Sequence, residues 1–292
     1  MLKNTLKTSV LLAALGGLFV AVGAILGGST GATLGLLIGL VLVGGSYWFS
    51  DKLALKAARA QIVTEQQAPE LYRMVAGLAQ RAELPMPVVA ISPALQPNAF
   101  ATGRNPKHAV VCCTQGILNS LSGDELEGVL AHEMMHVKHR DILIGSVAAA
   151  IATGISYAAQ LAMFSAMFGG GRDDREGGFL GPLLIAILAP LAAGLMQMAV
   201  SRSREFEADR GGAALLGTGE PLARALEHIE TAAKQLPPME VAPAQAYAWI
   251  HNPLAELKGS RNAQQARMAN LFSTHPPTAE RIRRLRAMNH SH

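Results

Sequence analysis

The sequence is poor in charged residues and in cysteine. Lys, Arg, Asp and Glu make up 16% of the 292 residues, whereas apolar residues make up 50%. Soluble proteins usually contain about 25% charged residues, so a wholly water-soluble chain is disfavoured. The only cysteines, Cys112 and Cys113, are adjacent, and in a strand their side chains point to opposite faces. This disfavours a disulfide and excludes a metal site built from cysteines, and it fits a reducing cytoplasm.

Charged residues are absent from four long apolar segments, which are residues 9–27, 32–49, 142–168 and 179–200. A helix needs about 20 apolar residues to cross the hydrocarbon core of a membrane. The sequence therefore predicts two transmembrane helical hairpins, the first of which turns near residues 28–31. A cleaved signal peptide is the alternative for the first segment, and a buried or interfacial hairpin is the alternative for the second pair.

Eight basic residues flank these segments on one side of an even-numbered bundle, whereas the loop at 172–176 on the other side has three acids against two bases. The eight are Lys3, Lys7, Lys52, Lys56, Arg59, Arg140, Arg202 and Arg204. Because such residues are retained in the cytoplasm, we expect a multi-pass protein of the cytoplasmic membrane with both termini inside. The parts of the chain are then an N-terminal hairpin at 1–50, cytoplasmic residues 51–141, a second hairpin at 142–200 and cytoplasmic residues 201–292. The net charge of +4 fits attraction to anionic lipid, and no nucleic-acid signature accompanies it.

Small residues recur along the second apolar segment. Gly31, Gly35 and Gly39 are spaced every four residues and therefore lie on one helix face. Such a face lets helix backbones approach closely. We interpret it as packing within this chain, with self-association as the alternative.

The remaining sequence alternates helical periodicity with short strand-like runs. Helices are predicted at 68–82, from about 123 toward 141, and at 201–216, 221–235 and 277–288. Residues 88–91 and 109–113 are typical of paired strands, and the turn-rich residues 97–107 separate them. Residues 236–259 are expected to form a mobile loop. The predicted fold class is α+β, mostly helical with a small β-sheet, beside two transmembrane hairpins.

The helix that begins near residue 123 carries the strongest chemical signal. Ser122 and Glu125 form a capping box at its start. Further along, the pattern His132-Glu133-x-x-His136 places two imidazoles one turn apart, so that both can reach one metal ion. Glu133 is then placed to activate a water molecule. The pattern arises by chance in about 1% of chains of this length, and two solvent-facing helix histidines are the alternative reading.

A catalytic zinc ion needs a third protein ligand and one open position. Glu205 and Asp209 lie four residues apart on one face of a helix, so Glu205 is expected to complete the ligand set. Asp209 is expected to accept a hydrogen bond from a ligand imidazole. Because His136 lies six residues before the third apolar segment and Glu205 five residues after the fourth, a hairpin between them brings both together. His139 is an alternative third ligand.

Three motifs extend this pattern along the chain. They are His132-Glu133-Met134-Met135-His136, Ser203-Arg204-Glu205-Phe206-Glu207-Ala208-Asp209, and Ser273-Thr274-His275-Pro276-Pro277 with Glu280-Arg281. Together they resemble the HtpX family of membrane zinc metalloproteases, which is related to the Ste24 and Oma1 peptidases, and the likeness covers nearly the whole chain. The resemblance implies a zincin-like (gluzincin) domain with one Zn²⁺ per subunit. It also implies an endopeptidase that cleaves misfolded or damaged membrane proteins at the cytoplasmic face of the inner membrane, in quality control under stress.

Two further roles are open at this stage. His275 is a candidate donor to the developing oxyanion because of its place in the third motif, with helix capping or a buried structural role as the alternative. Asn98, Ala99, Phe100 and Ala101 are candidate substrate-binding residues, since an extended peptide can add to a strand there. A homo-oligomer and membrane quality-control partners are also open.

Two other classes of protein compete with this interpretation. A membrane scaffold or transporter with incidental histidines would bind no zinc. A zinc hydrolase of small substrates would bind the ion without cleaving unfolded protein. Zinc binding and proteolysis, measured on the same preparation, therefore distinguish the three.

Overall fold

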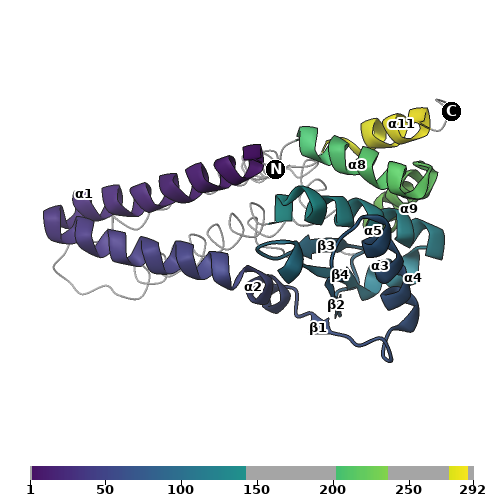
Figure 1. Cartoon of the computed structure of the whole chain (residues 1–292), viewed down its shortest axis with the longest axis horizontal. Coiled ribbons are helices and arrows are strands. Elements are labelled where there is room, and N and C mark those ends of the chain that lie inside the picture. Colours follow the sequence, from purple (N-terminus) through teal and green to yellow (C-terminus); the bar gives the residue numbers. More distant parts are fainter. Residues whose placement is uncertain (1, 143–201, 236–275, 289–292) are drawn as a thin grey trace.

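The computed structural model describes residues 2–142, 202–235 and 276–288, and it shows a long helical hairpin beside an α+β body (Figure 1). The described elements are α1 (Leu2–Trp48), α2 (Ser50–Ala57), β1 (Gln61–Ile62), α3 (Pro69–Arg81), β2 (Val88–Ser92), β3 (Ala99–Thr102), η1 (Pro106–His108), β4 (Val110–Thr114), α4 (Gln115–Ser120), α5 (Gly123–His139), α8 (Arg202–Leu216), α9 (Glu220–Gln235) and α11 (Thr278–Met288). These elements confirm the prediction of a mostly helical fold with a small sheet.

Several predictions concern residues outside the described ranges. The second apolar pair, apart from Ile142, the expected loop at 236–259 and His275 all lie there. Among the residues that the structure does describe, no helix combines the length and the apolar character needed to cross a membrane. The membrane-spanning assignment therefore stays a prediction.

The N-terminal helix α1 runs as two antiparallel arms that turn near Gly28, within the range expected for the turn (Figure 1). Gly28 has a φ of +60°, which glycine adopts without steric cost. The backbones of the two arms are in close contact at glycine residues. A Cβ added at Gly35 would overlap the carbonyl oxygen of Phe19, and one added at Gly31 would overlap that of Gly23. The small-residue face therefore packs within the chain, as interpreted from its spacing.

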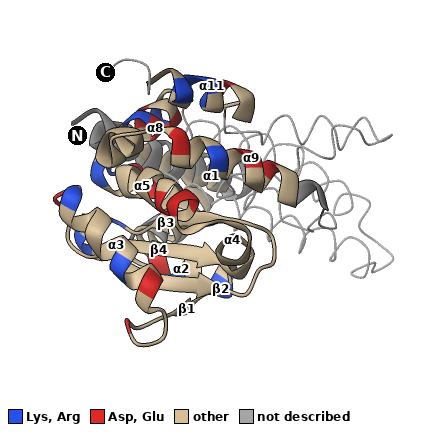
Figure 2. Cartoon of the chain, turned by 90° about the vertical axis from the view of Figure 1, so that its right-hand side faces the viewer, with Lys and Arg blue, Asp and Glu red and all other residues tan. Residues whose placement is uncertain are grey.

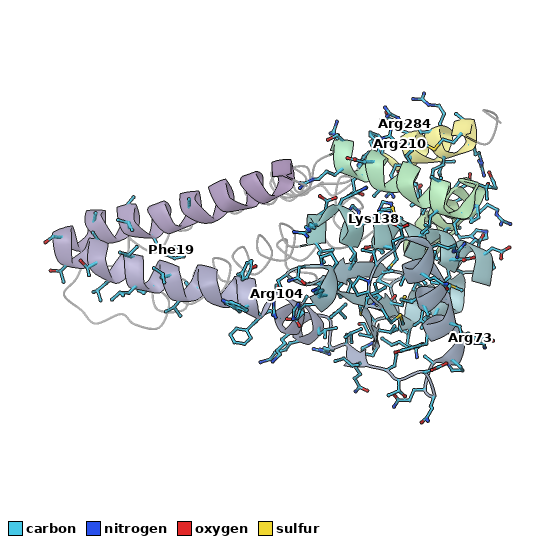
Figure 3. All side chains as sticks on the ribbon, viewed as in Figure 1. Phe19, Arg73, Arg104, Lys138, Arg210 and Arg284 are labelled. Atoms are coloured by element: carbon cyan, nitrogen blue, oxygen red, sulfur yellow. The ribbon has the colours of Figure 1, made fainter. Side chains whose placement is uncertain are left out.

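The base of the hairpin is joined to the α+β body through Arg104. Its guanidinium lies 4.9 Å from the ring centroid of Trp48 and donates a hydrogen bond of 3.4 Å to the Trp48 carbonyl oxygen. Figure 3 shows Arg104 at this junction, where α1 meets the sheet region. A cation–π contact of this kind contributes about 0.5–1 kcal/mol at an exposed site, so it orients the hairpin more than it stabilises the fold.

The four-stranded sheet has the order β1-β2-β4-β3. The two predicted strands, β2 and β4, are its parallel central pair, with Val88 opposite Val110 and Ser92 opposite Thr114. Every residue of β4 is buried, which fits a run of β-branched residues and cysteine in the middle of a sheet. β1 and β3 flank this pair in antiparallel orientation.

Strand β3 is a difference from the sequence prediction. Residues 97–107 are turn-rich in sequence, yet Ala99–Thr102 pair with β4, and Ala99 lies opposite Cys113. Its sequence, Ala-Phe-Ala-Thr, is short, and its two alanines, which are depleted in strands, offset the strand preference of Phe100 and Thr102. The strand forms because β4 offers it a ladder of backbone partners, which is a tertiary effect.

The helix α5 lies against the sheet on one side and against α8 and α9 on the other (Figure 2). It begins at the predicted capping box, where the Ser122 backbone N–H and hydroxyl both donate to the Glu125 carboxylate at 3.0 Å. Its last residue is His139, and the residue that follows, Arg140, has a left-handed φ of 59°. The side chains of Leu130 and Met134 are fully buried in the main core. The helix that carries the histidines is thus the central element of the body.

The contact between the arms of α1 predicts opposite effects for two equivalent substitutions. Gly35→Ala should lower the midpoint of thermal unfolding in detergent, because the new Cβ meets the backbone of Phe19. Gly44→Ala should leave it unchanged or raise it, because nothing lies within 4 Å of a Cβ there and alanine favours a helix by about 1 kcal/mol. Circular dichroism measures both. Equal stability of the two variants would contradict the packing.

The capping box predicts a pH-dependent contribution from Glu125. Burial raises its pKa, but hydrogen bonds from Ser122 and the pairing with His228 outweigh this and lower the pKa overall. The ionised carboxylate therefore stabilises the fold above its unfolded-state pKa, and this contribution is lost as the pH falls through the folded-state pKa. Glu125→Gln should cost about 1 kcal/mol at neutral pH and progressively less in acid.

Thermal unfolding of the chelator-treated protein between about pH 2 and pH 7 measures this difference, because the range extends well below the ordinary Glu pKa of about 4.3, where the contribution is lost. Glu70→Gln, an exposed acid in the first turn of α3, is the matched control. A stability difference that stays constant across the range would show that the Glu125 charge is not involved.

Candidate metal centre

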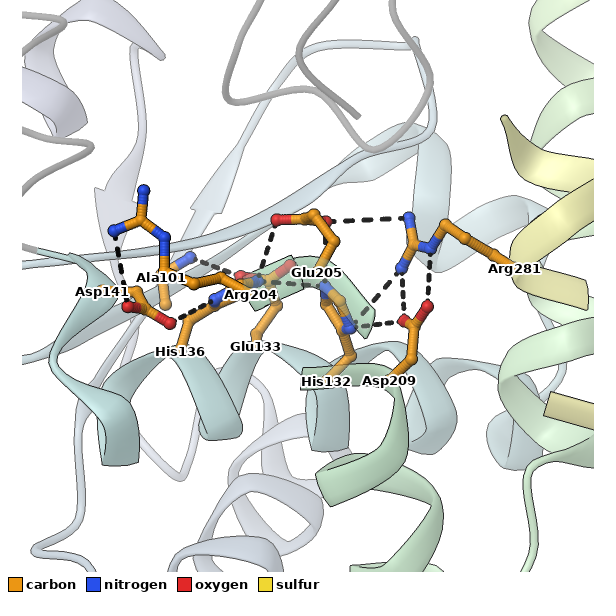
Figure 4. A network of polar contacts seen from close by, with 9 residues as sticks. All are labelled: Ala101, His132, Glu133, His136, Asp141, Arg204, Glu205, Asp209 and Arg281. Atoms are coloured by element: carbon orange, nitrogen blue, oxygen red, sulfur yellow. Dashed lines mark hydrogen bonds and ion pairs between the residues drawn. The ribbon is translucent and has the colours of Figure 1, made fainter. Parts of the chain in front are cut away.

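The candidate metal centre lies where α5 passes α8 (Figure 4). The Nε2 atoms of His132 and His136 are 3.1 Å apart. The carboxylate of Glu205 lies 3.8 Å from Nε2 of His132 and 3.5 Å from Nε2 of His136. One ligand atom from each of the three residues lies within 4.8 Å of the others. Two imidazoles and one carboxylate fit a tetrahedral ion with one open position.

Glycines on α8 permit this close approach. A Cβ added at Gly212 would lie 3.0 Å from the backbone nitrogen of His132, and one at Gly211 would lie 2.8 Å from the side chain of Met135. The two helix backbones can therefore cross next to His132. Among the described residues, the group that can hold an ion contains Glu205 and does not contain His139.

The imidazole of His132 is oriented by Asp209. Its Nδ1 lies 2.9 Å from Oδ1 of Asp209, so Nδ1 donates the hydrogen bond and Nε2 is left to face Glu205. Burial alone raises the pKa of Asp209. The charge of Arg281 and the hydrogen bonds from His132 and Arg281 outweigh this effect and hold the pKa well below its usual range. Asp209 is therefore a stable carboxylate acceptor for His132.

The imidazole of His136 has a similar partner, Asp141. Nδ1 of His136 lies 3.4 Å from Oδ2 of Asp141, and Asp141 in turn forms an ion pair of 3.7 Å with Arg204. Burial lowers the pKa of His136, but the nearby carboxylates of Asp141, Glu205 and Glu133 outweigh it and raise the pKa to about 9. Each histidine is thus backed by an aspartate that faces an arginine.

Glu133 lies on α5 between the two histidines and points toward strand β3 (Figure 4). Its carboxylate accepts a hydrogen bond of 2.9 Å from the backbone N–H of Ala101. Of the predicted substrate-binding residues, Ala99, Phe100 and Ala101 are in β3. Asn98 immediately precedes this strand, and its carbonyl accepts a hydrogen bond from the Thr114 backbone. The end strand of the sheet therefore lies directly beside the candidate general base.

The charges of this region favour a divalent cation. Four carboxylates meet here, those of Glu133, Asp141, Glu205 and Asp209, and two guanidinium groups face them, those of Arg204 and Arg281. With both imidazoles neutral, as they have to be to bind a metal ion, the sum is −4 plus +2, or −2. All six side chains are almost fully buried, and buried charge has to be compensated. A divalent ion supplies the missing charge, so the residues present fit the metal that their pattern implies.

Three residues of the centre, Asp141, Arg204 and Arg281, are not among the site residues predicted from the sequence. Asp141 carries a signal, since it is an acid directly after the histidine helix, five residues from His136. Arg281 lies 72 residues from Asp209 in sequence, and no local pattern connects them. Only the packing of α11 against α8 reveals that contact.

Comparison with known proteins places the chain in a family. Residues 65–289 match the model of peptidase family M48. A protease HtpX homologue of Persephonella marina is 52% identical over 289 residues, which cover 98% of this chain and 97% of that protein. The homologue of Syntrophobacter fumaroxidans is 49% identical and covers 97% and 98%. That of Thermococcus kodakarensis is 51% identical and covers 96% and 94%.

A solved structure, that of S. mikatae Ste24p, matches with a TM-score of 0.49 and 20% identity, and the match covers 97% of this chain. The chain spans 65% of the length of that protein. By the extent of its match to the family and its identity to the HtpX homologues, the chain belongs to the HtpX proteases of peptidase family M48, which confirms the metalloprotease class predicted from its sequence.

Proposed function

We propose that this protein is a zinc-dependent membrane endopeptidase that binds one Zn²⁺ per subunit through His132, His136 and Glu205. The observation that carries the proposal is the convergence of these three donors within 4.8 Å, next to the carboxylate of Glu133. Zinc suits this donor set, because catalytic zinc sites commonly use histidine nitrogen and glutamate oxygen and keep one position of a tetrahedron open. When bound, zinc supplies a Lewis acid that polarises a carbonyl and acidifies water.

Glu133 is the proposed general base and acid. Its carboxylate takes the proton of the attacking water and then passes it to the nitrogen of the leaving amine. The Ala101 N–H holds one carboxylate oxygen, Oε2, at 2.9 Å, so the hydrogen bond fixes the orientation of the group. His275 lies outside the described residues, and its role as an oxyanion donor stays a proposal.

The substrate is proposed to bind as an extended strand along β3. Because the Ala101 N–H donates to Glu133 and not to β4, the outer edge of β3 faces the base. Ala99, two residues earlier, presents its backbone to the same edge. An added strand would thus lie next to Glu133 and be recognised through its backbone, which suits broad specificity toward unfolded segments.

The location of the enzyme is proposed from the hairpin and the charge pattern. The hairpin projects away from the body (Figure 1), and side chains on its second arm are exposed, including Leu40 at 67% and Val41 at 73%. An apolar surface of this kind favours contact with lipid. We propose transmembrane hairpins at 1–50 and 142–200, with the two protease parts, 51–141 and 201–292, at the cytoplasmic face. Misfolded or damaged membrane proteins are the proposed substrates, in quality control under stress.

Glu133→Gln should abolish proteolysis without removing the metal. We expect the rate of casein cleavage by detergent-purified, zinc-loaded protein to fall by about 100-fold or more, since the proton carrier is lost. Chelation should have the same effect on the unaltered protein. Glu127→Gln, which alters a partly exposed acid on the same helix, should retain full activity. A metal-free yet fully proteolytic enzyme would refute the proposal, and zinc binding without casein cleavage would indicate a hydrolase of small substrates.

Glu205→Ala should weaken zinc retention. We expect a loss of affinity larger than the roughly 10- to 100-fold caused by losing an outer hydrogen-bond partner, because a direct ligand is removed. Glu207→Ala is the matched control, since Glu207 lies on the same helix and is exposed. Metal content after dialysis, measured by elemental analysis, distinguishes them. Equal zinc in both variants would assign the third position to His139 or another donor.

A further inference from the structure

The C-terminal helix α11 inserts one arginine into the metal centre. Nε and Nη2 of Arg281 donate to the two carboxylate oxygens of Asp209 at 2.9 and 2.7 Å. Nη1 lies 4.0 Å from Glu205, and the side chain of Arg281 is 2% exposed. Figure 4 shows the guanidinium above Asp209, on the side away from His136. Its Nη2 also lies 3.5 Å from Nδ1 of His132, a longer approach than its two bonds to Asp209. Arg281 therefore pairs mainly with the carboxylate that orients His132, and it lies near His132 and Glu205.

The geometry at Asp209 is that of a shared acceptor. Its Oδ1 receives both Nδ1–H of His132 at 2.9 Å and Nη2–H of Arg281 at 2.7 Å. Two parallel bonds from a planar guanidinium fix the plane of a carboxylate, which a single bond cannot do. Fixing that plane also fixes the direction from which His132 donates, and hence where its Nε2 points.

The docking of α11 does not depend on Arg281 alone. Arg286 donates to Glu220 and Glu227 of α9 at 2.9–3.3 Å, away from the metal centre. Leu285 of α11 is fully buried in the main core. A helix held in these ways needs no buried charge for its stability, and an ion pair in the interior is often no more stable than apolar residues of the same volume. The burial of Arg281 thus points to a role beyond anchoring.

We propose that Arg281 is a positioning residue for the metal centre, which acts through Asp209 to hold the His132 imidazole ready for the ion. The placement of the Arg281 guanidinium against Asp209, and not the overall stability of α11, then determines how well the metal is retained. This inference rests on the proposed zinc site. It predicts that a substitution at Arg281 weakens zinc binding, whereas loosening α11 elsewhere lowers stability only.

The test compares zinc dissociation constants, measured by competition with a chromogenic chelator, and unfolding midpoints of the metal-free full-length protein. Arg281→Gln should weaken zinc binding by about 10-fold, the lower end of the range for outer partners. The zinc dissociation constant of Arg281→Lys should lie between those of Arg281→Gln and the unaltered protein, because an ammonium group cannot form both parallel hydrogen bonds. Arg286→Gln, the matched control on the same helix, should lower the unfolding midpoint and leave the dissociation constant unchanged.

A double-mutant cycle separates action through Asp209 from a general structural effect. In an Asp209→Asn background, Arg281→Gln should cause no further loss of zinc affinity, because the carboxylate through which it acts is gone. Fully additive losses would overturn the inference, as would equal dissociation constants for the Arg281 and Arg286 variants. If Arg281→Gln does not fold, Arg281→Lys replaces it in the comparison with Arg286→Gln and in the double-mutant cycle. If the unaltered protein retains no zinc, the proposed function is refuted, and this inference, which rests on it, no longer applies.

Discussion

Compensation of buried charge between α5, α8 and α11 is the constraint on which this structure depends. Four carboxylates and two arginines are packed there around two imidazoles, almost out of contact with water. An unpaired ion in such a place costs several kcal/mol, so each group has to be held opposite a partner. The result is a layered arrangement in which His132 and His136 face inward, an aspartate stands behind each, and an arginine stands behind each aspartate.

This constraint explains features that lie outside the site. The capping box fixes where α5 begins, and α5 then carries both histidines and Glu133 in a single buried turn. Gly212 allows α8 to come close enough for Glu205 to meet them. The sheet ends in β3, and its Ala101 N–H holds Glu133 from the other side. The proposed metal ligands, the proposed general base and the proposed substrate strand are thus positioned by three different elements that share one core, as rigid placement of reacting groups requires.

Local patterns predicted much of this fold correctly. The capping box, the apolar periodicity of α3 and α9 and the β-branched runs of β2 and β4 each express a preference within a few residues, and each appears where expected. Strand β3 was missed, because Ala99 to Thr102 are only four residues in which two alanines offset two strand formers, and they pair with β4, which lies beside them only in the folded protein. Asp141 and Arg281 were left without a role for a related reason, since their partners are side chains on other helices.

The sequence by itself determined the chemistry of the centre. The candidate donors can be read from two histidines one turn apart, a glutamate between them and a Glu-x-x-x-Asp pair on a later helix. Helical spacing fixes which of these side chains share a face. The tertiary structure decided how these faces meet: which carboxylate backs which imidazole, that Arg281 reaches in from the far end of the chain, and that β3 lies against the base. Such contacts join residues far apart in sequence, so they exist only once the packed core holds the helices and the sheet in place.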